Sequence, residues 1–201
     1  MTRIIYVNEH VEVRMRVNRE QMRANRERIL SEAGRLFRER GFENVGVAEV
    51  MRAAGMTHGG FYGHFASKDD LVVQTLTQLF APRDAASDPA MTDFLDVYLS
   101  PKHRDSPGTG CPTAALSVDA ARQTEAARRS LSAGIEAQIA RMAARLGDEA
   151  GDHNRVAATG IWAAMVGALV LARAADAPLS DRILADAKAW IAGRLDAPGD
   201  T

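Results

Sequence analysis

The sequence predicts an all-α protein with an N-terminal head of three helices and a larger helical domain behind it. With 201 residues, the chain can hold one large or two small domains with a buried core. Apolar residues recur at helical steps of three and four, and no persuasive strand alternation follows residue 20. Clusters of proline, glycine and aspartate interrupt this pattern at 81–90, 100–112 and 147–154, and we expect no helix to pass through them.

Composition is that of a soluble protein, with 46% hydrophobic and 25% charged residues. The single cysteine excludes an intramolecular disulfide and suits a reducing compartment. The most apolar run, 156–175, is rich in alanine and glycine and falls short of a convincing membrane span. Glu9 and Glu12 stand where a signal peptide would have a long apolar core, so we expect a cytoplasmic protein with no membrane partner.

The net charge of −1 conceals an asymmetry between the two ends of the chain. Residues 1–80 hold 12 Lys and Arg against 10 Asp and Glu, whereas residues 81–201 hold 13 against 16. The basic excess is densest in one run of arginines: Arg14, Arg16, Arg19, Arg23, Arg26 and Arg28. Such a run is either a solvated helix face or an arm facing nucleic-acid phosphates, and composition alone leaves both open.

The first helix of the head is predicted at about 19–40, where one face collects the apolar residues Met22, Ile29, Ala33, Leu36 and Phe37. Gly41 can adopt the left-handed conformation that ends a helix, and Phe42 can pack back over the last turn. A short second helix at about 47–54 would bury Val47, Val50, Met51 and Ala54.

A glycine-containing turn follows the second helix. Gly55 and Met56 form this turn, and Thr57 is a suitable N-cap for a third helix that ends near Phe65. Ser67 then caps a longer helix, with Asp70 in the position of a capping-box acid. Helices joined by such a turn form a helix-turn-helix.

The third helix has an unusual face that is almost bare backbone. On an α-helical wheel Phe61 and Phe65 share the buried side, and the opposite side holds Gly59, Gly60 and Gly63, flanked by Tyr62 and His64. A bare face lets a helix press deep into a DNA groove while flanking donors reach phosphates on either wall. The alternative is a surface helix weakened by glycine, since each glycine costs roughly 1 kcal/mol against alanine.

These residues resemble a known family. The stretch "GFENVGVAEVMRAAGMTHGGFYGHFASKDDLV", residues 41–72, is similar to the DNA-binding domain of TetR-type bacterial transcriptional regulators, and the resemblance extends over about 22–80. It implies that Tyr62, His64 and Lys68 bind backbone phosphates. It also implies that Thr57, His58 and Gly60 face the groove. The helical wheel adds Gly59 and Gly63 to the candidate DNA-binding residues.

Two positions depart from the family pattern. Val47 stands near where the family often has a threonine that caps the second helix. Gly63 stands where a larger side chain often reads a base, so we expect few direct base contacts.

The resemblance also implies an organisation for the whole chain. Residues 19–80 would form the DNA-binding domain with the start of a linking helix, and residues 81–201 a domain that binds a ligand and dimerises. The residue pattern of 1–18 leaves open whether this N-terminal extension is flexible or ordered: the runs RIIYV and VEVRM have weak strand character, and Met15 is a possible alternative start. The expected function is a ligand-responsive repressor that binds a palindromic double-stranded operator as a homodimer, with a hydrophobic or amphipathic inducer and no cofactor or metal.

The C-terminal half contains two helices with contrasting patterns. The predicted helix 155–175 is apolar on nearly all sides, with small residues that permit close approach of another helix: Gly160, Ala163, Ala164, Gly167 and Ala168. Helix 179–195 carries one apolar stripe: Ile183, Leu184, Ala187, Trp190, Ile191 and Leu195. The first helix is covered either by a partner subunit, in a four-helix seam, or by an intramolecular core.

Cys111 offers an alternative function. It precedes Pro112, which favours the first position of a helix, so the thiol would lie at a helix N-terminus that stabilises a thiolate. His103 and Asp105 are near in sequence, so a thiol enzyme or a thiol-based redox sensor is conceivable. A buried small hydrophobe or a pocket-lining residue is the other interpretation. His103 and Cys111 lack the companions of a zinc site, and no phosphate-binding loop or dinucleotide fingerprint is present.

Overall fold

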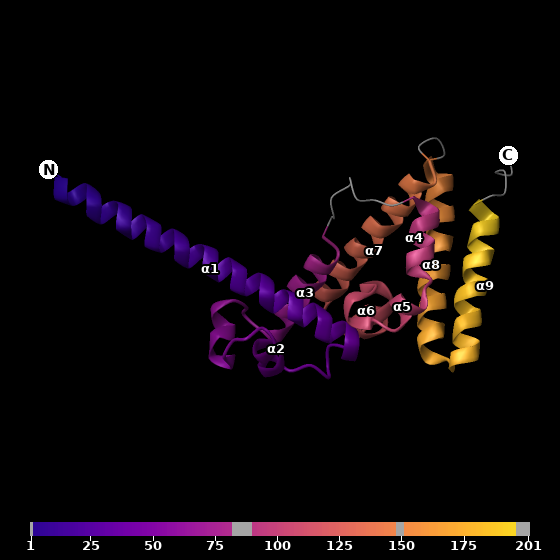
Figure 1. Cartoon of the computed structure of the whole chain (residues 1–201), viewed down its shortest axis with the longest axis horizontal. Helices are drawn as coiled ribbons and strands as arrows, with labels where there is room; N and C mark the ends of the chain where they lie inside the picture. Colours follow the sequence, from indigo (N-terminus) through magenta and orange to yellow (C-terminus); the bar gives the residue numbers. More distant parts are fainter. Residues whose placement is uncertain (1, 82–89, 148–150, 196–201) are drawn as a thin grey trace.

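The computed structural model describes residues 2–81, 90–147 and 151–195, and all regular structure in these ranges is helical (Figure 1). The expected break at 81–90 falls largely on residues outside the described ranges. At 147–154, however, α8 already begins at Gly151, so the second half of that expected break is helical. The prediction of an all-α fold with an N-terminal helix-turn-helix head is confirmed.

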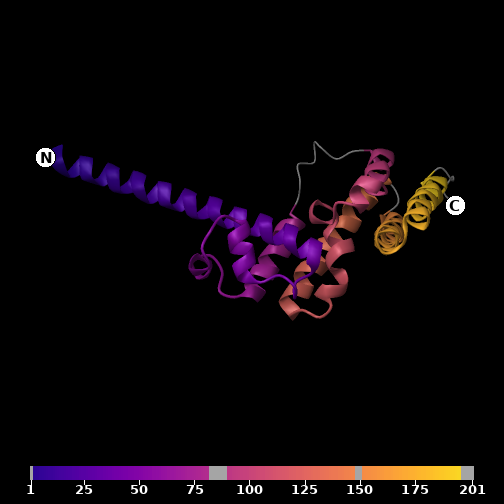
Figure 2. The same cartoon turned by 60° about the horizontal axis from the view of Figure 1, so that its bottom comes forward.

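The first helix, α1 (Thr2–Arg40), is far longer than predicted. It begins at Thr2 instead of near Arg19, so the runs of weak strand character in this segment lie within a helix. Strand-like runs in a short segment are overridden when they continue an established helix. The N-terminal half of α1 projects away from all other helices (Figures 1 and 2).

The C-terminal half of α1 forms one side of the hydrophobic core of the head. Ile29, Ala33, Leu36 and Phe37 are buried as predicted, whereas Met22 is 42% exposed. Gly41 ends the helix with φ +78°, and its N–H donates to the Phe37 carbonyl at 2.7 Å. Phe42 packs edge-on against Phe37, with ring centroids 5.1 Å apart, as predicted.

The rest of the head consists of α2 (Val47–Ala53), η1 (His58–Gly63) and α3 (Lys68–Leu79). Gly55, at φ +73°, makes the turn between α2 and η1. The side chains that fill the core between these elements and α1 come from every one of them: Ile29, Phe37, Met51, Phe61, Leu71 and Leu76. Val47 is only half-buried, because it lies in the first turn of α2 at the edge of this core.

The body comprises α4 (Met91–Tyr98), α5 (Pro101–Arg104), η3 (Pro107–Thr109), α6 (Pro112–Ala120), α7 (Glu125–Arg145), α8 (Gly151–Ala174) and α9 (Ala177–Leu195). The expectation that 100–112 holds no helix was wrong, since α5 and η3 lie there. Each of them begins at a proline, where the missing N–H has no helical partner to lose. Proline therefore starts short helices in this segment rather than preventing them.

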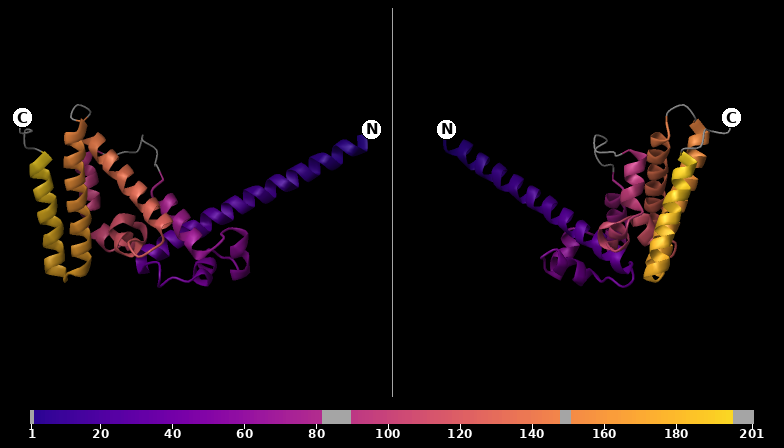
Figure 3. Two further views of the ribbon diagram at one scale, coloured as in Figure 1. Left: turned by 180° about the vertical axis from the view of Figure 1, so that it is seen from behind. Right: turned by 45° about the vertical axis from the view of Figure 1, so that its right-hand side comes forward.

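Helices α8 and α9 lie side by side at the end of the molecule opposite the projecting half of α1 (Figure 3). Their inner faces pack on α4 and α7 around a second core that includes Leu95, Met142, Met165, Leu169 and Ile191. Residues Asn154–Ala174 are long and apolar enough to cross a membrane by length and composition alone, with mean hydropathy 1.7 and 39% of the window buried. Core helices of soluble proteins pass the same test.

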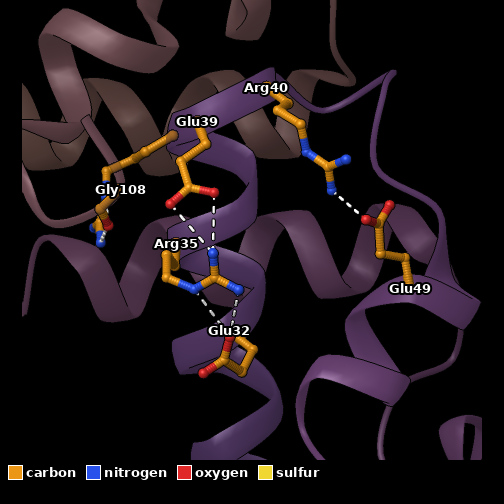
Figure 4. Close-up of polar contacts among 7 residues, drawn as sticks. Glu32, Arg35, Glu39, Arg40, Glu49 and Gly108 are labelled. Carbon is orange, nitrogen blue, oxygen red and sulfur yellow. Dashed lines mark hydrogen bonds and ion pairs between the residues drawn. The ribbon is translucent and has the colours of Figure 1, made fainter. Parts of the chain in front are cut away.

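Two joints hold the head to the body. At the first, the ring of Phe80 at the end of α3 lies so close to Gly134 of α7 that any side chain at Gly134 would collide with it. At the second, the last turns of α1 meet η3 (Figure 4). There the Arg38 guanidinium donates to the Gly108 carbonyl, with its Nε 2.9 Å from the oxygen.

Candidate nucleic-acid interface

The third helix of the head is a 3₁₀-helix, not the α-helix that the wheel assumed. The Gly60 N–H donates to the Thr57 carbonyl at 3.1 Å, and the His64 N–H donates to the Phe61 carbonyl at 2.8 Å. Glycine disfavours the α-helix, and a segment this short is where 3₁₀ geometry is tolerated. Thr57 is the N-cap residue as predicted, but its side chain accepts no cap hydrogen bond.

The buried side of η1 is the one that the sequence predicted. Phe61 is 1% exposed and Phe65 2%, and their rings stack with centroids 5.6 Å apart. The Phe65 N–H donates to the Phe61 carbonyl at 3.0 Å, an α-type bond that returns both rings to one side. This local widening explains why the wheel placed both rings correctly although most of the segment is 3₁₀.

The exposed side of η1 is nearly bare, and the fold itself does not require it to be. Gly59, Gly60 and Gly63 are all exposed, and none of them has a positive φ. A Cβ added at Gly59 or Gly63 would meet nothing within 4 Å, and one at Gly60 would only touch the Met51 side chain at 3.7 Å. Neither backbone conformation nor internal packing therefore explains the three glycines.

Polar groups surround this bare face. Thr57 and His58 are exposed at its start, and Tyr62 is 71% exposed. The Tyr62 ring packs edge-on against Phe61 with centroids 5.3 Å apart. This contact holds the ring in place while most of the side chain stays exposed to solvent. His64 and Lys68 are half-buried, with Lys68 the first residue of α3. The structure thus gathers the residues predicted for DNA binding around one end of the head.

Arg26 holds η1 and the residue after it from their buried side, and this role was not predicted from the sequence. Its Nη1 donates to the His64 carbonyl at 2.6 Å, and its guanidinium lies 4.7 Å from the centroid of the Phe65 ring. The spacing does indicate that Arg26 lies on the buried stripe of α1, three residues before Ile29 and seven before Ala33, but it does not indicate which group Arg26 contacts. Among the arginines of the run whose side chains are described, Arg19, Arg23 and Arg28 are exposed.

The start of α3 is fixed by the predicted cap. The Ser67 hydroxyl accepts from the Asp70 N–H at 3.1 Å, and the Asp70 carboxylate accepts from the Ala66 N–H at 2.9 Å. Hydrogen bonds from Gln74 and from the Ala66 N–H hold the pKa of Asp70 below its usual value, with a smaller contribution from the charge of Arg26. This network fixes the first turn of α3, where Lys68 lies.

The start of α2 lacks any comparable cap. Its N-cap residue is Gly46, which makes no side-chain hydrogen bond, and Val47 cannot supply one. The departure that the sequence showed at Val47 therefore corresponds to a missing side-chain cap. The backbone N–H groups of Glu49 and Val50 still bond the Gly46 carbonyl, at 3.1 and 3.2 Å.

Cys111 occupies the N-cap of α6 as predicted, but His103 is not placed as its base. The thiol sulfur accepts from the Ala114 N–H at 3.4 Å, and the residue is only 7% exposed. Nε2 of His103 accepts from the backbone N–H of Cys111 at 2.9 Å, while Nδ1 lies 2.7 Å from the Tyr98 carbonyl and must donate to it. Asp105 pairs with Arg104 instead. Both imidazole nitrogens are thus used by the backbone, and the redox-sensor hypothesis stays a prediction.

No group of three or more metal-binding side chains occurs among the residues that the structure describes. What it does show is a three-helix head whose exposed short helix follows a glycine turn. These features define a helix-turn-helix DNA-binding protein.

Comparisons with known proteins extend this result. Residues 29–75 match the family model of bacterial regulatory proteins, tetR family. The fold of the chain is similar to that of reduced NemR from E. coli, with TM-score 0.69 and 23% identity over 85% of this chain and 96% of that one. It is also similar to a TetR family regulator from Agrobacterium tumefaciens, with TM-score 0.68 and 20% identity over 85% and 98% of the two chains.

A third similar structure is FadR from Bacillus subtilis in complex with stearoyl-CoA, with TM-score 0.58 and 12% identity over 86% of this chain and 99% of that one. A search of curated protein sequences found no match. At these identities the solved structures show the shared fold, and the family model identifies the head. The head of the chain, residues 29–75, thus matches the bacterial regulatory proteins of the tetR family, and the solved structures, which are transcriptional regulators, show that the chain as a whole shares their fold.

Proposed function

We propose that this chain is a transcriptional regulator of the tetR type that binds a palindromic operator with the bare face of η1 in the major groove. The observation that carries the proposal is the set of three exposed glycines that neither φ nor packing explains. Close approach of the η1 backbone to DNA would explain why glycine stands at these three positions. The proposal places Thr57 and His58 at the base edges, with Gly59, Gly60 and Gly63 against the groove.

The phosphate contacts are assigned to the residues around that face. Tyr62 offers a hydroxyl on a ring held by Phe61, and Lys68 offers an ammonium at a capped helix start. His64 is held by the contact of its carbonyl with Arg26. Phosphate contacts of this kind fix the register of a protein on DNA without reading its sequence.

A homodimer would present two heads to the two halves of a palindrome. We assign its seam to the outer face of α8 and α9, which leaves large apolar side chains in solvent: Val156 is 72% exposed, Leu171 60% and Trp190 49%. Gly160 and Gly167 lie on the same helix, and a Cβ at either would meet nothing within 4 Å. A second copy could therefore approach α8 closely, which supports the seam over the purely intramolecular core.

The regulator would act as a repressor in the cytoplasm and release its operator when the body binds a small molecule. We expect a hydrophobic or amphipathic inducer, in keeping with the apolar body. The presence of stearoyl-CoA in the FadR structure shows that this fold can hold an amphipathic molecule. The support here is a shared fold, not a shared pocket.

The direct test uses duplex DNA that the protein itself selects from a randomised library. Lys68→Ala should weaken binding to all duplexes about equally and reduce the slope of log affinity against log salt by about 0.9, the value for one phosphate. Lys102→Ala removes an exposed lysine from α5 in the body and serves as the matched control. An unchanged affinity and salt slope for Lys68→Ala would contradict the phosphate assignment.

A further inference from the structure

A second polar site lies in the body, beside the joint with the head. An open hollow of about 470 Å³ is lined by α1 on one side and by α6 and α8 on the other, with Arg38, Glu39, Arg104 and Arg173 as its charged residues. A smaller hollow of about 270 Å³ adjoins it and shares Arg104 and Arg173. The first volume is within the range of small-molecule sites.

Arg173 is the unusual member of this site. Its side chain is half-buried, and its two described hydrogen bonds go to backbone carbonyls: Nε to Arg104 at 3.1 Å and Nη2 to His103 at 3.2 Å. Among the described residues, no carboxylate pairs with it. Burial lowers the pKa of Arg173, which reports the loss of hydration around a guanidinium that nevertheless stays charged.

The neighbouring charges do not compensate it. Arg104 forms ion pairs with Asp105 at 2.7 Å and with Asp181 at 2.6 Å, so both carboxylates are paired with Arg104 and not with Arg173. Glu39, the acid on the lining of the larger hollow, is bound by Arg35 at 3.0 Å. Arg38, on the side formed by α1, is itself a cation and cannot compensate the charge of Arg173. These carboxylates are thus bound by Arg35 and Arg104, and none of the described carboxylates pairs with Arg173.

The remaining lining is small and apolar, with Ala114 and Ala115 from α6 and Val170 from α8. A guanidinium beside a short apolar wall is complementary to a carboxylate on a short hydrocarbon stem, because the planar donor fork fits the carboxylate oxygens. We propose that this hollow, which we call the joint site, binds a small aliphatic carboxylate through Arg173. The joint site does not presuppose that the chain binds DNA.

The test measures binding directly, by isothermal titration of the intact protein at constant ionic strength. Hexanoate should bind with a dissociation constant of about 1 mM or tighter, whereas hexan-1-ol, with the same stem and no charge, should not bind. Arg173→Gln should weaken hexanoate binding about tenfold or more. Arg129→Gln, which removes an exposed arginine of α7, should leave it unchanged.

A second pair of variants keeps the test decisive if Arg173→Gln does not fold. Val170 is 42% exposed, so both Asp and Asn are tolerated there. Val170→Asp supplies the missing negative charge within the chain and should abolish hexanoate binding, while the isosteric Val170→Asn should retain it. Binding to hexanol as strong as to hexanoate, binding of inorganic phosphate alone, or equal binding by the Asp and Asn variants would overturn the proposal.

Discussion

His103 shows how one buried side chain fixes a loop. It bonds the Tyr98 carbonyl on one side and the Cys111 N–H on the other, and its ring lies edge-on to that of Tyr98 with centroids 4.7 Å apart. Only the neutral ring with its proton on Nδ1 makes both bonds, because a proton on Nε2 would face another N–H. Burial is the main cause that lowers the pKa of His103, and the nearby charge of Arg173 lowers it further.

This arrangement predicts a pH dependence of stability. On unfolding, the His103 pKa returns to about 6.5, so between that value and its lower folded value the unfolded chain binds more protons. The free energy of unfolding should therefore fall as the pH is lowered from about 7 to about 5. Urea unfolding of His103→Gln should show a smaller fall, and His58→Gln, at an exposed histidine, the wild-type fall. An equal fall in His103→Gln would contradict the assignment.

At the scale of elements, the glycine content of η1 lowers the stability of this helix. Three of its six residues are glycines in conformations that other residues adopt. Two of the three have open space where a side chain would go. Gly55, only three residues before η1, is different because its φ of +73° requires glycine.

This contrast gives a prediction on stability that is independent of DNA. Gly59→Ala and Gly63→Ala should each raise the free energy of unfolding by up to about 1 kcal/mol, since alanine loses less backbone entropy on folding. Gly55→Ala should lower it by about 1–2 kcal/mol, because alanine is strained in the left-handed region. Denaturant titration of the three variants decides the matter. A loss of stability at Gly63→Ala would mean that the fold itself requires this glycine.

The elements of the head were predictable because their signals are local. Gly41, Gly55 and Ser67 mark helix ends by backbone conformation or by a cap, and all three were placed correctly from sequence. The 3₁₀ form of η1 was not predictable, because the period of a six-residue segment does not separate it from an α-helix. The bond from Arg26 to the His64 carbonyl spans 38 residues and depends on tertiary packing, which a pattern along one helix does not contain.

At the scale of the whole molecule, the two proposed surfaces, one for DNA and one for a second copy of the chain, lie at opposite ends. The head presents η1, and α8 and α9 lie at the far end with their outer faces in solvent (Figure 3). Between them, the contact of Arg38 with Gly108 and the packing of Phe80 on Gly134 tie head to body. These contacts are the route by which the proposed binding of a small molecule in the body would affect the head.

The proposed dimer seam predicts a folded monomer when it is disrupted. Leu171→Glu places a charge on a side chain that is 60% exposed within one chain, so the subunit should fold while losing its partner. Sedimentation velocity should then show a monomer at concentrations where the wild-type protein is a dimer. Val118→Glu is the control, because Val118 is 71% exposed on α6, away from the seam. A dimer that survives Leu171→Glu would place the seam elsewhere.

The most direct test of the docking of η1 on DNA is the affinity and sequence preference of Gly63→Arg on the duplex library selected by the wild-type protein. A Cβ at this position meets nothing in the folded chain, so the variant should fold. With the bare face in the groove, the long side chain should weaken binding to the wild-type sequence about tenfold or select a different one. Val118→Arg adds the same charge to α6 and should change neither. Unchanged affinity and unchanged preference in Gly63→Arg would show that this face of η1 does not enter the groove.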